Sequence, residues 1–289
     1  MPEFPELEAV REVLGRQVVG QTISEVQVLP PGGTIVVRDL THGDFESALT
    51  GATVAGIARR GKFLVFSFQQ PALFLVLNPK LTGRLQLAAS TDKRTAKTHV
   101  VFTFANGRQL RYYDQKQMGQ LYLTRDLASI PDYAGLGPEP FDLSLEQFRE
   151  RLKPNHGEIK GVLTRGEFVA GIGNAYADEI LWAARLHPYR KRTQLTTEEV
   201  ERLYTAMRTT LLEAAEKVRE EMGENIHLKP RDFLAVHMKT GQPCPRCGTP
   251  ISLVGANQRI TNFCRACQPG GLIKGMEDQN PLIFANRHE

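Results

Sequence analysis

The residues best suited to chemistry are the second and third of the chain, Pro2 and Glu3, which directly follow Met1. A small residue after Met1 normally permits removal of the initiator methionine, and Pro2 would then carry a free secondary amine. An α-amino group titrates at about 7.7–8.0, so part of the population is an unprotonated nucleophile that can form a Schiff base with a carbonyl-like carbon. Glu3 would be an adjacent proton donor or acceptor. Taken alone, Pro2 and Pro5 are more simply explained as residues that begin a helix.

The four cysteines of the chain form two close pairs near its end. Each pair has the spacing C-x2-C and sixteen residues separate the pairs, as expected for tetrahedral zinc bound by Cys244, Cys247, Cys264 and Cys267. Four thiolates leave no coordination position for water, so we predict one structural zinc ion rather than a catalytic one. The hairpin between the pairs carries Arg259 and Thr261, which could bind a phosphate or be ordinary turn residues.

Two further motifs combine glycine with groups that can hold an anion. Gly171 and Gly173 stand directly before a predicted helix that begins at Asn174, where backbone N–H groups favour an anion. With the helix predicted before it, this turn forms a helix–two-turns–helix unit. Residues 59–62 read Arg-Arg-Gly-Lys and place Lys62 at the start of a strand, in a turn that could bind phosphates. Neither motif is decisive alone, since glycine is common between helices and basic turns are usually solvated.

Bulk composition sets limits on the class of protein. With 289 residues, the chain is long enough for about two domains. It is 41% hydrophobic and 24% charged, with a net charge of +4, which permits a polyanionic partner without requiring one. No apolar run approaches the ~18 residues of a membrane span, and the N-terminus lacks the pattern of a secretion signal. We therefore expect a cytoplasmic or nucleoid protein without a membrane partner, where paired cysteines favour a metal site over disulfides.

Hydrophobic periodicity indicates the elements that would position these residues. Residues 6–19 repeat apolar side chains with helical spacing, which would place Pro2 and Glu3 at the start of a helix. Residues 22–123 contain short β-branched and aromatic runs, among them 34–38 and 63–68, that are typical of a β-sandwich or barrel. One short helix is predicted over 44–49. Further helices are predicted over 143–152, 157–165, 174–186 and 196–222, the last of which opens with the capping-box pair Thr196 and Glu199.

These patterns predict an α+β fold with two domains. The first would be a β-sandwich or barrel over residues 1–131, followed by a linker rich in proline and glycine over 132–143. The second would contain a helical, helix–two-turns–helix part over 144–240 and a zinc-finger hairpin with four cysteines over 241–268. We assign no role to the extension over 269–289.

Together, the motifs resemble those of the formamidopyrimidine-DNA glycosylase / endonuclease VIII family of base-excision repair proteins. The resemblance rests on the Pro-Glu start, the Arg-Arg-Gly-Lys turn, the sequence Gly-Ile-Gly-Asn-Ala-Tyr-Ala-Asp-Glu at 171–179, and the zinc ribbon with Arg259 and Thr261. These occur in the same order as in the family and cover the chain to about residue 268. The resemblance implies an N-terminal β-sandwich flanked by helices that is joined to a helix–two-turns–helix and zinc-finger domain. It also implies a structural zinc ion and a monomeric enzyme that acts on double-stranded DNA with damaged bases or abasic sites.

The resemblance also implies roles for individual residues. Pro2 would attack C1′ of a damaged nucleotide, release the base and form an iminium, and β- and δ-elimination would then cut the strand. Glu3 would be the acid/base, and Lys62 would contact a phosphate and assist. Phosphates flanking the lesion would be bound by Lys160, Asn174 and Arg259. Because the damaged nucleotide must first leave the base stack, at a cost of roughly a few kcal/mol, the expected activity is that of a bifunctional DNA glycosylase/AP lyase for oxidised or ring-opened bases.

Three positions depart from the formamidopyrimidine type, in which Met, Arg and Phe fill the space left by the flipped nucleotide. The corresponding residues here are Leu81, Lys116 and Met118, of which leucine and methionine can still insert apolar bulk into the stack. Lys116 cannot reproduce the planar, bidentate contacts of arginine, so we expect a weaker or different choice of the opposite base. The stretch 218–244 is short for a loop that closes over 8-oxoguanine, so we do not expect efficient removal of 8-oxoguanine, and ring-opened purines or oxidised pyrimidines are the alternative substrates.

Other functions stay open at this stage. A glycosylase of the same fold could take alkylated or crosslinked bases. A non-catalytic protein could bind damaged DNA, although binding alone needs neither Pro2 nor Glu3. An RNA-processing zinc ribbon is disfavoured by the match at the N-terminus. The sequence indicates neither the preferred lesion nor whether Met1 is removed, and if Met1 persists, the nitrogen of Pro2 is an amide and not a nucleophile.

Overall fold

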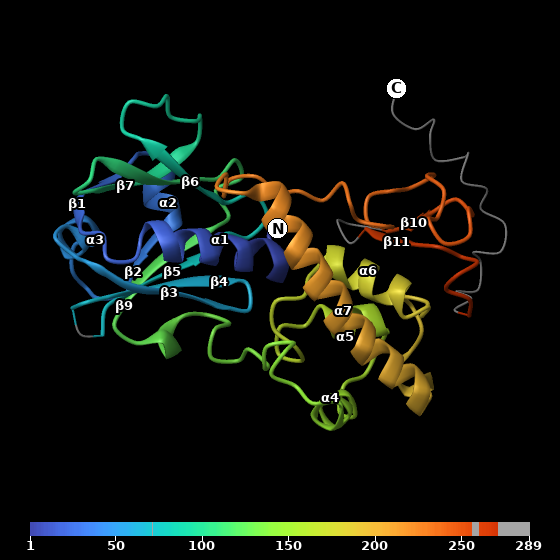
Figure 1. Cartoon of the computed structure of the whole chain (residues 1–289). Coiled ribbons are helices and arrows are strands. Elements are labelled where there is room, and N and C mark those ends of the chain that lie inside the picture. Colours follow the sequence, from blue (N-terminus) through green and yellow to red (C-terminus); the bar gives the residue numbers. More distant parts are fainter. Residues whose placement is uncertain (71, 256–259, 271–289) are drawn as a thin grey trace. The chain divides into compact units, whose positions relative to one another are not determined.

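The computed structural model describes residues 1–70, 72–255 and 260–270, which fall into two compact units (Figure 1). Unit 1 comprises Met1–Leu136 together with Ala214–Arg231. Unit 2 comprises Gly137–Glu213 and the described residues from Asp232 onward. The chain thus leaves unit 1, crosses into unit 2, and later returns to unit 1 for one segment before it leaves again. Local periodicity in the sequence does not predict this return.

Unit 1 is built on two β-sheets (Figure 1). The first has four antiparallel strands in the order β1 (Ile23–Val28), β7 (Thr98–Phe104), β8 (Arg108–Tyr113) and β6 (Arg84–Ala89). The second has five strands in the order β2 (Val37–Asp39), β9 (Gln120–Thr124), β5 (Phe74–Asn78), β4 (Phe63–Phe68) and β3 (Val54–Arg60). In this sheet β2 and β9 pair in parallel, and the other neighbours are antiparallel. The buried apolar side chains of both sheets form the core of the predicted sandwich.

Short helices complete unit 1. The helix α1 (Phe4–Gln17) buries Leu7, Val10 and Leu14 on the face that the sequence periodicity indicates. The predicted helix over 44–49 is confirmed as α3 (Phe45–Leu49), followed later by the 3-10 turn η1 (Leu127–Ser129). The strand predicted over 34–38 is wrong for residues 34–36, which belong to α2 (Gly32–Val36), and is confirmed only at its end, where β2 begins at Val37. The turn that leads into α2 is closed by the backbone N–H of Gly33, which donates to Leu29 O at 2.7 Å.

Unit 2 combines short helices with a zinc-finger hairpin. Its elements in chain order are α4 (Leu145–Leu152), α5 (Ile159–Leu163), α6 (Asn174–Ala183), η2 (Arg192–Gln194), the first part of α7 (Thr197–Met222), β10 (Ser252–Val254) and β11 (Thr261–Phe263). The predicted capping box of α7 is confirmed. The Thr196 N–H donates to Glu199 Oε2 at 2.9 Å, and the Glu199 N–H donates to Thr196 Oγ1 at 3.3 Å. This reciprocal pair explains why the helix begins at this point.

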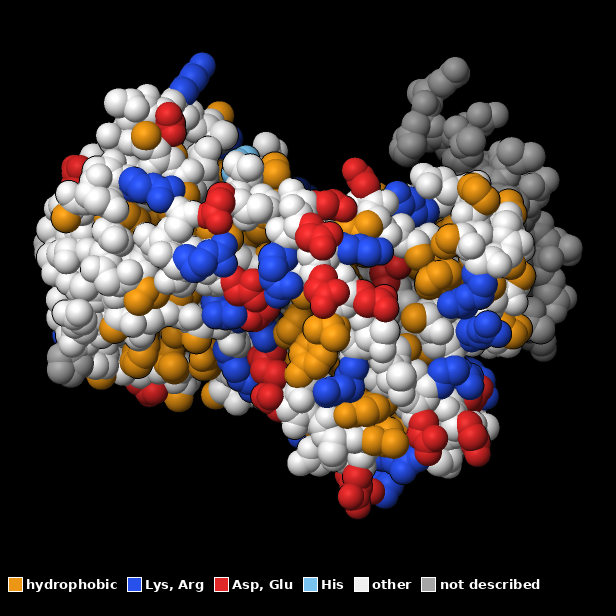
Figure 2. Space-filling view, viewed as in Figure 1, with side chains coloured by type: hydrophobic (Ala, Val, Ile, Leu, Met, Phe, Trp, Pro, Cys, Tyr) orange, Lys and Arg blue, Asp and Glu red, His pale blue; other side chains and the backbone are white. Residues whose placement is uncertain are grey.

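Charged side chains of both signs are mixed on the face shown in Figure 2. Within unit 1, Arg219 Nε lies 2.7 Å from Glu12 Oε2, and Arg16 Nη2 lies 3.0 Å from Glu224 Oε1. Such pairs join α1 to the returning segment of the chain. None of the described helices combines the length and the apolar character that a membrane span requires.

Candidate active site

The first residues of the chain are buried at the N-terminal end of α1. Pro2 is buried, and Glu3 and Glu6 are only 3% and 2% exposed. The helix begins at Phe4, and the backbone N–H of Glu3 donates to Glu6 Oε2 at 2.8 Å. This contact satisfies a donor that has no partner within the helix. The chain terminus that the sequence predicts to be reactive therefore has a fixed place, with two carboxylates beside it.

Arg231 brings positive charge to these two carboxylates. Its Nε lies 2.6 Å from Glu6 Oε1, and its Nη2 lies 3.6 Å from Glu3 Oε1. Nη2 also donates to the backbone oxygen of Met1 at 3.1 Å. Buried carboxylates need such partners because desolvation penalises their charge. No local sequence motif marks Arg231 as a functional residue, and only the return of the chain to unit 1 brings it to this site.

The amino group of Met1 lies in surroundings that disfavour positive charge. Burial lowers the pKa of this group from 8.0 to about 5, with the neighbouring charges of Lys229 and Arg231 acting in the same direction. The negative charge of Glu3 opposes the shift but does not cancel it. An amine in this position is therefore neutral, and so nucleophilic, at neutral pH.

Lys62 stands in the turn between β3 and β4, as the sequence predicts. Burial lowers the pKa of its ammonium group, and the negative charge of Glu3 acts against this effect. The structure therefore brings the charges of Lys62 and Glu3 into the same site. The other two cations of the Arg-Arg-Gly-Lys turn have structural contacts. Arg59 Nε lies 2.7 Å from Glu8 Oε2, and Arg60 Nη2 donates to Leu136 O at 2.8 Å.

A pocket opens beside Pro2 within unit 1. It is lined mainly by apolar side chains of α1, β4, β5 and β6 and by the segment after α7. The charged residues in its wall are Glu6, Arg84 and Lys229. A group bound in this pocket would lie next to Pro2. It would have few polar partners, and the wall would offer it both a negatively charged side chain and positively charged ones.

The three residues expected to replace the flipped nucleotide lie on two loops that share one carboxylate. Leu81 is half-buried, Lys116 is exposed, and Met118 is 47% exposed. Asp114, which is fully buried, accepts from the hydroxyl group of Thr82 on the first loop. On the second loop, it accepts from the Lys116 N–H at 3.2 Å and the Gly119 N–H at 2.7 Å.

Asp114 therefore ties the loop of Leu81 to the loop of Lys116 and Met118. Tyr112 adds a further contact, since its hydroxyl group donates to Asp114 Oδ2 at 3.2 Å. A side chain at Gly119 would collide with this hydroxyl group, because an added Cβ would lie 1.9 Å from it. The sequence analysis did not single out Asp114, although an aspartate directly before a predicted loop is a common signal for backbone contacts.

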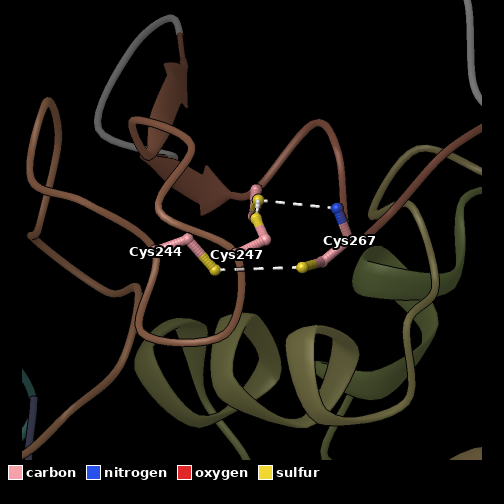
Figure 3. Close-up of side chains that lie close together, drawn as sticks. Cys244, Cys247 and Cys267 are labelled. Carbon is pink, nitrogen blue, oxygen red and sulfur yellow. Dashed lines mark hydrogen bonds between the residues drawn. The ribbon is translucent and has the colours of Figure 1, made fainter.

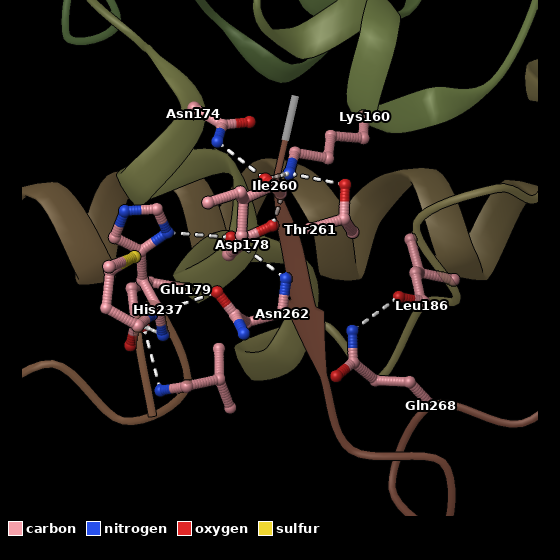
Figure 4. Close-up of polar contacts among 12 residues, drawn as sticks. Lys160, Asn174, Asp178, Glu179, Leu186, His237, Ile260, Thr261, Asn262 and Gln268 are labelled. Carbon is pink, nitrogen blue, oxygen red and sulfur yellow. Dashed lines mark hydrogen bonds and ion pairs between the residues drawn. The ribbon is translucent and has the colours of Figure 1, made fainter. Parts of the chain in front are cut away.

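In unit 2, two residues predicted to bind phosphate converge on the backbone just before β11 (Figure 4). Lys160 Nζ donates to Ile260 O at 2.9 Å and to Thr261 Oγ1 at 2.8 Å. Asn174 Nδ2 donates to the same carbonyl oxygen at 2.6 Å. Arg259, the third predicted phosphate ligand of this region, lies outside the described residues. A phosphate-binding role stays a prediction for all three.

Two adjacent acids of α6 hold the surrounding segments in place (Figure 4). Asp178 Oδ1 lies 2.7 Å from Lys160 Nζ, and Asp178 Oδ2 lies 2.8 Å from His237 Nδ1. Glu179 accepts from the backbone N–H groups of residues 235–237 at 2.8–2.9 Å. Both acids lie in the motif at 171–179, but the motif itself indicates no role for them. Two acidic residues within a helix that otherwise buries its side chains are the signal that could have indicated one.

The four cysteines converge as the spacing predicts (Figure 3). Their sulfur atoms all lie within 4.8 Å of one another, with Cys244 Sγ and Cys267 Sγ 3.9 Å apart and Cys247 Sγ and Cys264 Sγ 3.4 Å apart. Tetrahedral zinc with Zn–S bonds of about 2.3 Å requires sulfur atoms roughly 3.8 Å apart. The residues therefore fit one structural zinc ion. Trp182 of α6 adds a contact outside the predicted set, since its Nε1 lies 3.4 Å from Cys244 Sγ.

Comparison with known proteins identifies the class to which this fold and site belong. Three family models match consecutive parts of the chain: the formamidopyrimidine-DNA glycosylase N-terminal domain over residues 1–121, the formamidopyrimidine-DNA glycosylase H2TH domain over 136–224, and the zinc finger found in FPG and IleRS over 241–270. A formamidopyrimidine-DNA glycosylase from Symbiobacterium thermophilum is 40% identical over 281 residues, which cover 93% of this chain and 90% of that protein. The chain therefore belongs to the formamidopyrimidine-DNA glycosylase family, as the sequence motifs predict.

Solved structures of this family share the fold. The Lactococcus lactis protein in complex with DNA containing FAPY-dG is 32% identical, with a TM-score of 0.82, and the match covers 93% of this chain and all of that one. The same protein non-covalently bound to DNA with an AP site matches with a TM-score of 0.79 over the same shares of the two chains. A structure of MutM with DNA containing carbocyclic 8-oxo-G is 31% identical, with a TM-score of 0.82. These matches confirm the predicted α+β fold.

Proposed function

We propose that this protein is a bifunctional DNA glycosylase and AP lyase that excises oxidised or ring-opened bases from double-stranded DNA. The observation that carries the proposal is the buried chain terminus, where Pro2 lies beside Glu3 and Glu6 in a member of this family. The relatives are named formamidopyrimidine-DNA glycosylases, and the solved structures of the Lactococcus lactis protein contain DNA with FAPY-dG or an AP site. A protein that only bound damaged DNA would need neither a terminal amine nor an acid beside it.

The proposed reaction begins once Met1 has been removed. The Pro2 nitrogen attacks C1′, the bond from C1′ to the damaged base breaks, and the base leaves with the electron pair. The surroundings that keep the Met1 amine neutral would act on the Pro2 amine in the same way, so the nucleophile needs no separate deprotonation at neutral pH. Glu3 takes the proton that the Pro2 nitrogen loses when the new bond forms. The resulting iminium is an electron sink, and β- and δ-elimination cut the strand.

Cations on both units would hold the DNA backbone. Lys62 lies in the same site as Glu3 and would contact a phosphate next to the lesion. Lys160, Asn174 and Arg259 would bind phosphates from unit 2. Lys160 and Asn174 both contact Ile260 O, so these two side chains would also fix the backbone that directly follows Arg259 in the sequence. The zinc ion supplies no reactive group, since four thiolates complete its coordination, and would hold this hairpin.

The residues that depart from the family pattern would set the choice of lesion and opposite base. Leu81 and Met118 would fill the space left by the flipped nucleotide with apolar bulk. Lys116 would face the opposite base as a point charge and discriminate less sharply than arginine. The short segment 223–231 favours ring-opened purines and oxidised pyrimidines over 8-oxoguanine.

We further propose that the protein is a monomer and acts in the cytoplasm, at the bacterial nucleoid.

Covalent trapping on lesion-bearing DNA tests the proposed function. In the presence of a borohydride, the protein without Met1 is expected to become covalently linked to duplexes that contain an abasic site or a ring-opened purine. Pro2→Gly should abolish or greatly slow the reaction. A matched control is the same sequence with a short N-terminal extension, which keeps every side chain but converts the Pro2 nitrogen into an amide.

Intact mass establishes whether Met1 has been removed before the assay. Duplexes with oxidised pyrimidines, 8-oxoguanine and alkylated bases, each opposite the four normal bases, distinguish the proposed substrates from those of a same-fold alkylation or crosslink glycosylase. Absence of trapping on every abasic and lesion-bearing duplex by protein with a free Pro2 amine would contradict the proposed function.

A further inference from the structure

The returning segment of unit 1 places a guanidinium group next to the atom at which the reaction occurs. Arg231 has one side in contact with Glu6, at 2.6 Å, and Nη2 facing both Glu3 and the Met1 backbone oxygen. Its side chain is 16% exposed, so the group is largely shielded from water. The reaction scheme described above gives Arg231 no part.

The Met1 carbonyl group indicates where the substrate sugar would lie. Its carbon is bonded to the Pro2 nitrogen, as C1′ of the sugar would be after nucleophilic attack. The position of the Met1 oxygen therefore indicates where one of the substituents of C1′ would lie. Arg231 Nη2 lies 3.1 Å from this oxygen, a normal hydrogen-bond distance.

The sugar offers one acceptor in that position. After the base has left, C1′ carries a hydrogen atom, C2′, the Pro2 nitrogen and the ring oxygen O4′, of which O4′ is the substituent that can accept a hydrogen bond from a guanidinium. We propose that Arg231 donates a hydrogen bond to O4′ and is a further catalytic residue, acting at the opening of the sugar ring. This assignment rests on the proposed glycosylase and lyase function.

The step balances with the groups already present. The C1′–O4′ bond breaks, the lone pair of the Pro2 nitrogen forms the C=N bond of the iminium, and O4′ keeps the bonding pair. The proton that Glu3 received from the Pro2 nitrogen passes to O4′, which becomes a hydroxyl group. Arg231 stabilises the negative charge that develops on O4′ before the proton arrives, and a donor held ready in a water-poor site is especially effective in this role. Its contact with Glu6 fixes the guanidinium so that Nη2 faces the reacting atoms.

Two substrates test the role of Arg231, and they differ in the C1′–O4′ bond and in the bond from C1′ to the base. The first is a duplex with a ring-opened purine on an intact sugar, in which C1′–O4′ must break before the iminium can be trapped. The second is a duplex in which an acyclic aldehyde replaces the sugar, so that no C1′–O4′ bond exists. Trapping by cyanoborohydride is measured on both with the same protein preparation. The ratio of the two rates is then independent of the fraction of protein that is folded.

Arg231→Gln is expected to slow trapping on the intact sugar about 100-fold, the effect of removing one preorganised oxyanion donor, and to leave trapping on the acyclic aldehyde unchanged. Arg231→Lys, which keeps a charged donor, should recover part of the rate on the intact sugar. Arg219→Gln is the matched control, because Arg219 also pairs with a glutamate of α1, at 2.7 Å, but away from the terminus.

A rate ratio that is the same in Arg231→Gln and the unaltered protein would overturn the proposal, whether both rates fall or neither does. That result differs from failure of the proposed function, in which the unaltered protein traps neither substrate.

Discussion

Lys160 Nζ lies 2.7 Å from Asp178 Oδ1, in a pair whose side chains are only 9% and 0% exposed. The other carboxylate oxygen of Asp178 contacts His237 Nδ1 at 2.8 Å and accepts from the Asn262 N–H at 3.2 Å. One side chain of α6 thus joins α5, the segment before the zinc finger, and β11. A buried carboxylate with this many partners determines how these segments of unit 2 are arranged.

Asp178→Asn should therefore destabilise unit 2 strongly. The change removes the carboxylate charge next to the buried ammonium group of Lys160, and breaking one partner of a buried pair costs about 3–5 kcal/mol. The measurement is the free energy of unfolding of unit 2 in urea, followed by a signal from Trp182. Adding Lys160→Met to Asp178→Asn should recover part of the loss, because the buried ammonium group that Asp178 neutralises is then gone.

Glu150→Gln is the control for this prediction. Glu150 pairs with Lys153 on the surface, where the two side chains are 61% and 67% exposed. Such a pair is worth about 0–1 kcal/mol, so the control should change the free energy of unfolding little. Equal effects of the buried and the exposed substitution would show that Asp178 does not have the proposed structural role.

Local patterns in the sequence predict most elements of this fold, because their signals lie within short windows. Short β-branched and aromatic runs indicate the strands, and the Thr196–Glu199 pair indicates the start of α7. The failure at 34–36 has a local cause too, since β-branched residues suggested a strand where Gly33 closes a helical turn instead. The zinc ligands are likewise predictable, because the spacing of two short motifs determines them.

Contacts between distant parts of the chain could not be predicted from the sequence. Arg231 reaches Glu6 only because the chain returns to unit 1 after α7. The same holds for Lys160 and Ile260, whose contact depends on how the hairpin packs against α5 and α6. Within the basic turn, the sequence does not indicate that Arg59 pairs with Glu8, nor that Lys62 lies in the same site as Glu3.

Trp182 should report on the zinc ion directly. It is the single tryptophan of the chain, its Nε1 lies 3.4 Å from Cys244 Sγ, and the guanidinium carbon of Arg246 lies 4.1 Å from the centre of its ring. Removal of zinc by a chelator should change the intensity and wavelength of tryptophan emission, with one zinc ion released per chain. Adding zinc back should restore the signal. A fluorescence spectrum that stays constant while zinc is released would contradict this arrangement.

Asp114→Asn should loosen both loops that carry the residues expected to replace the flipped nucleotide. The substitution replaces one carboxylate oxygen by an amide NH2 group. This group would face a donor, either the Gly119 N–H or the hydroxyl group of Thr82. A buried polar group without a partner costs about 1–3 kcal/mol. We expect this loss in the free energy of unfolding, together with slower processing of a base lesion than of a preformed abasic site. Met118→Ala should slow lesion processing with little loss of stability, because Met118 is 47% exposed.

The matched control is Asp92→Asn, since Asp92 also accepts a backbone N–H, from Ala89 at 2.8 Å, but at an exposed position. It should alter neither the stability nor the ratio of the two rates. If Asp114→Asn behaves like this control, Asp114 does not hold the loops.

Protein that retains Met1 should lose stability as the pH falls from 8 to 5. The pKa of its amino group is about 5 in the folded state and 8.0 as the ordinary value, so the unfolded chain binds more protons between these limits. Stability from this group is therefore fully present above pH 8, declines through the interval, and is gone below pH 5. The measurement is urea unfolding at several pH values, with the Nα-acetylated protein as control because its terminus does not titrate. As the pH falls from 8 to 5, the free energy of unfolding of the free-amine form should decrease relative to that of the acetylated form. A difference between the two forms that does not change with pH would show that the amine is not buried beside Lys229 and Arg231.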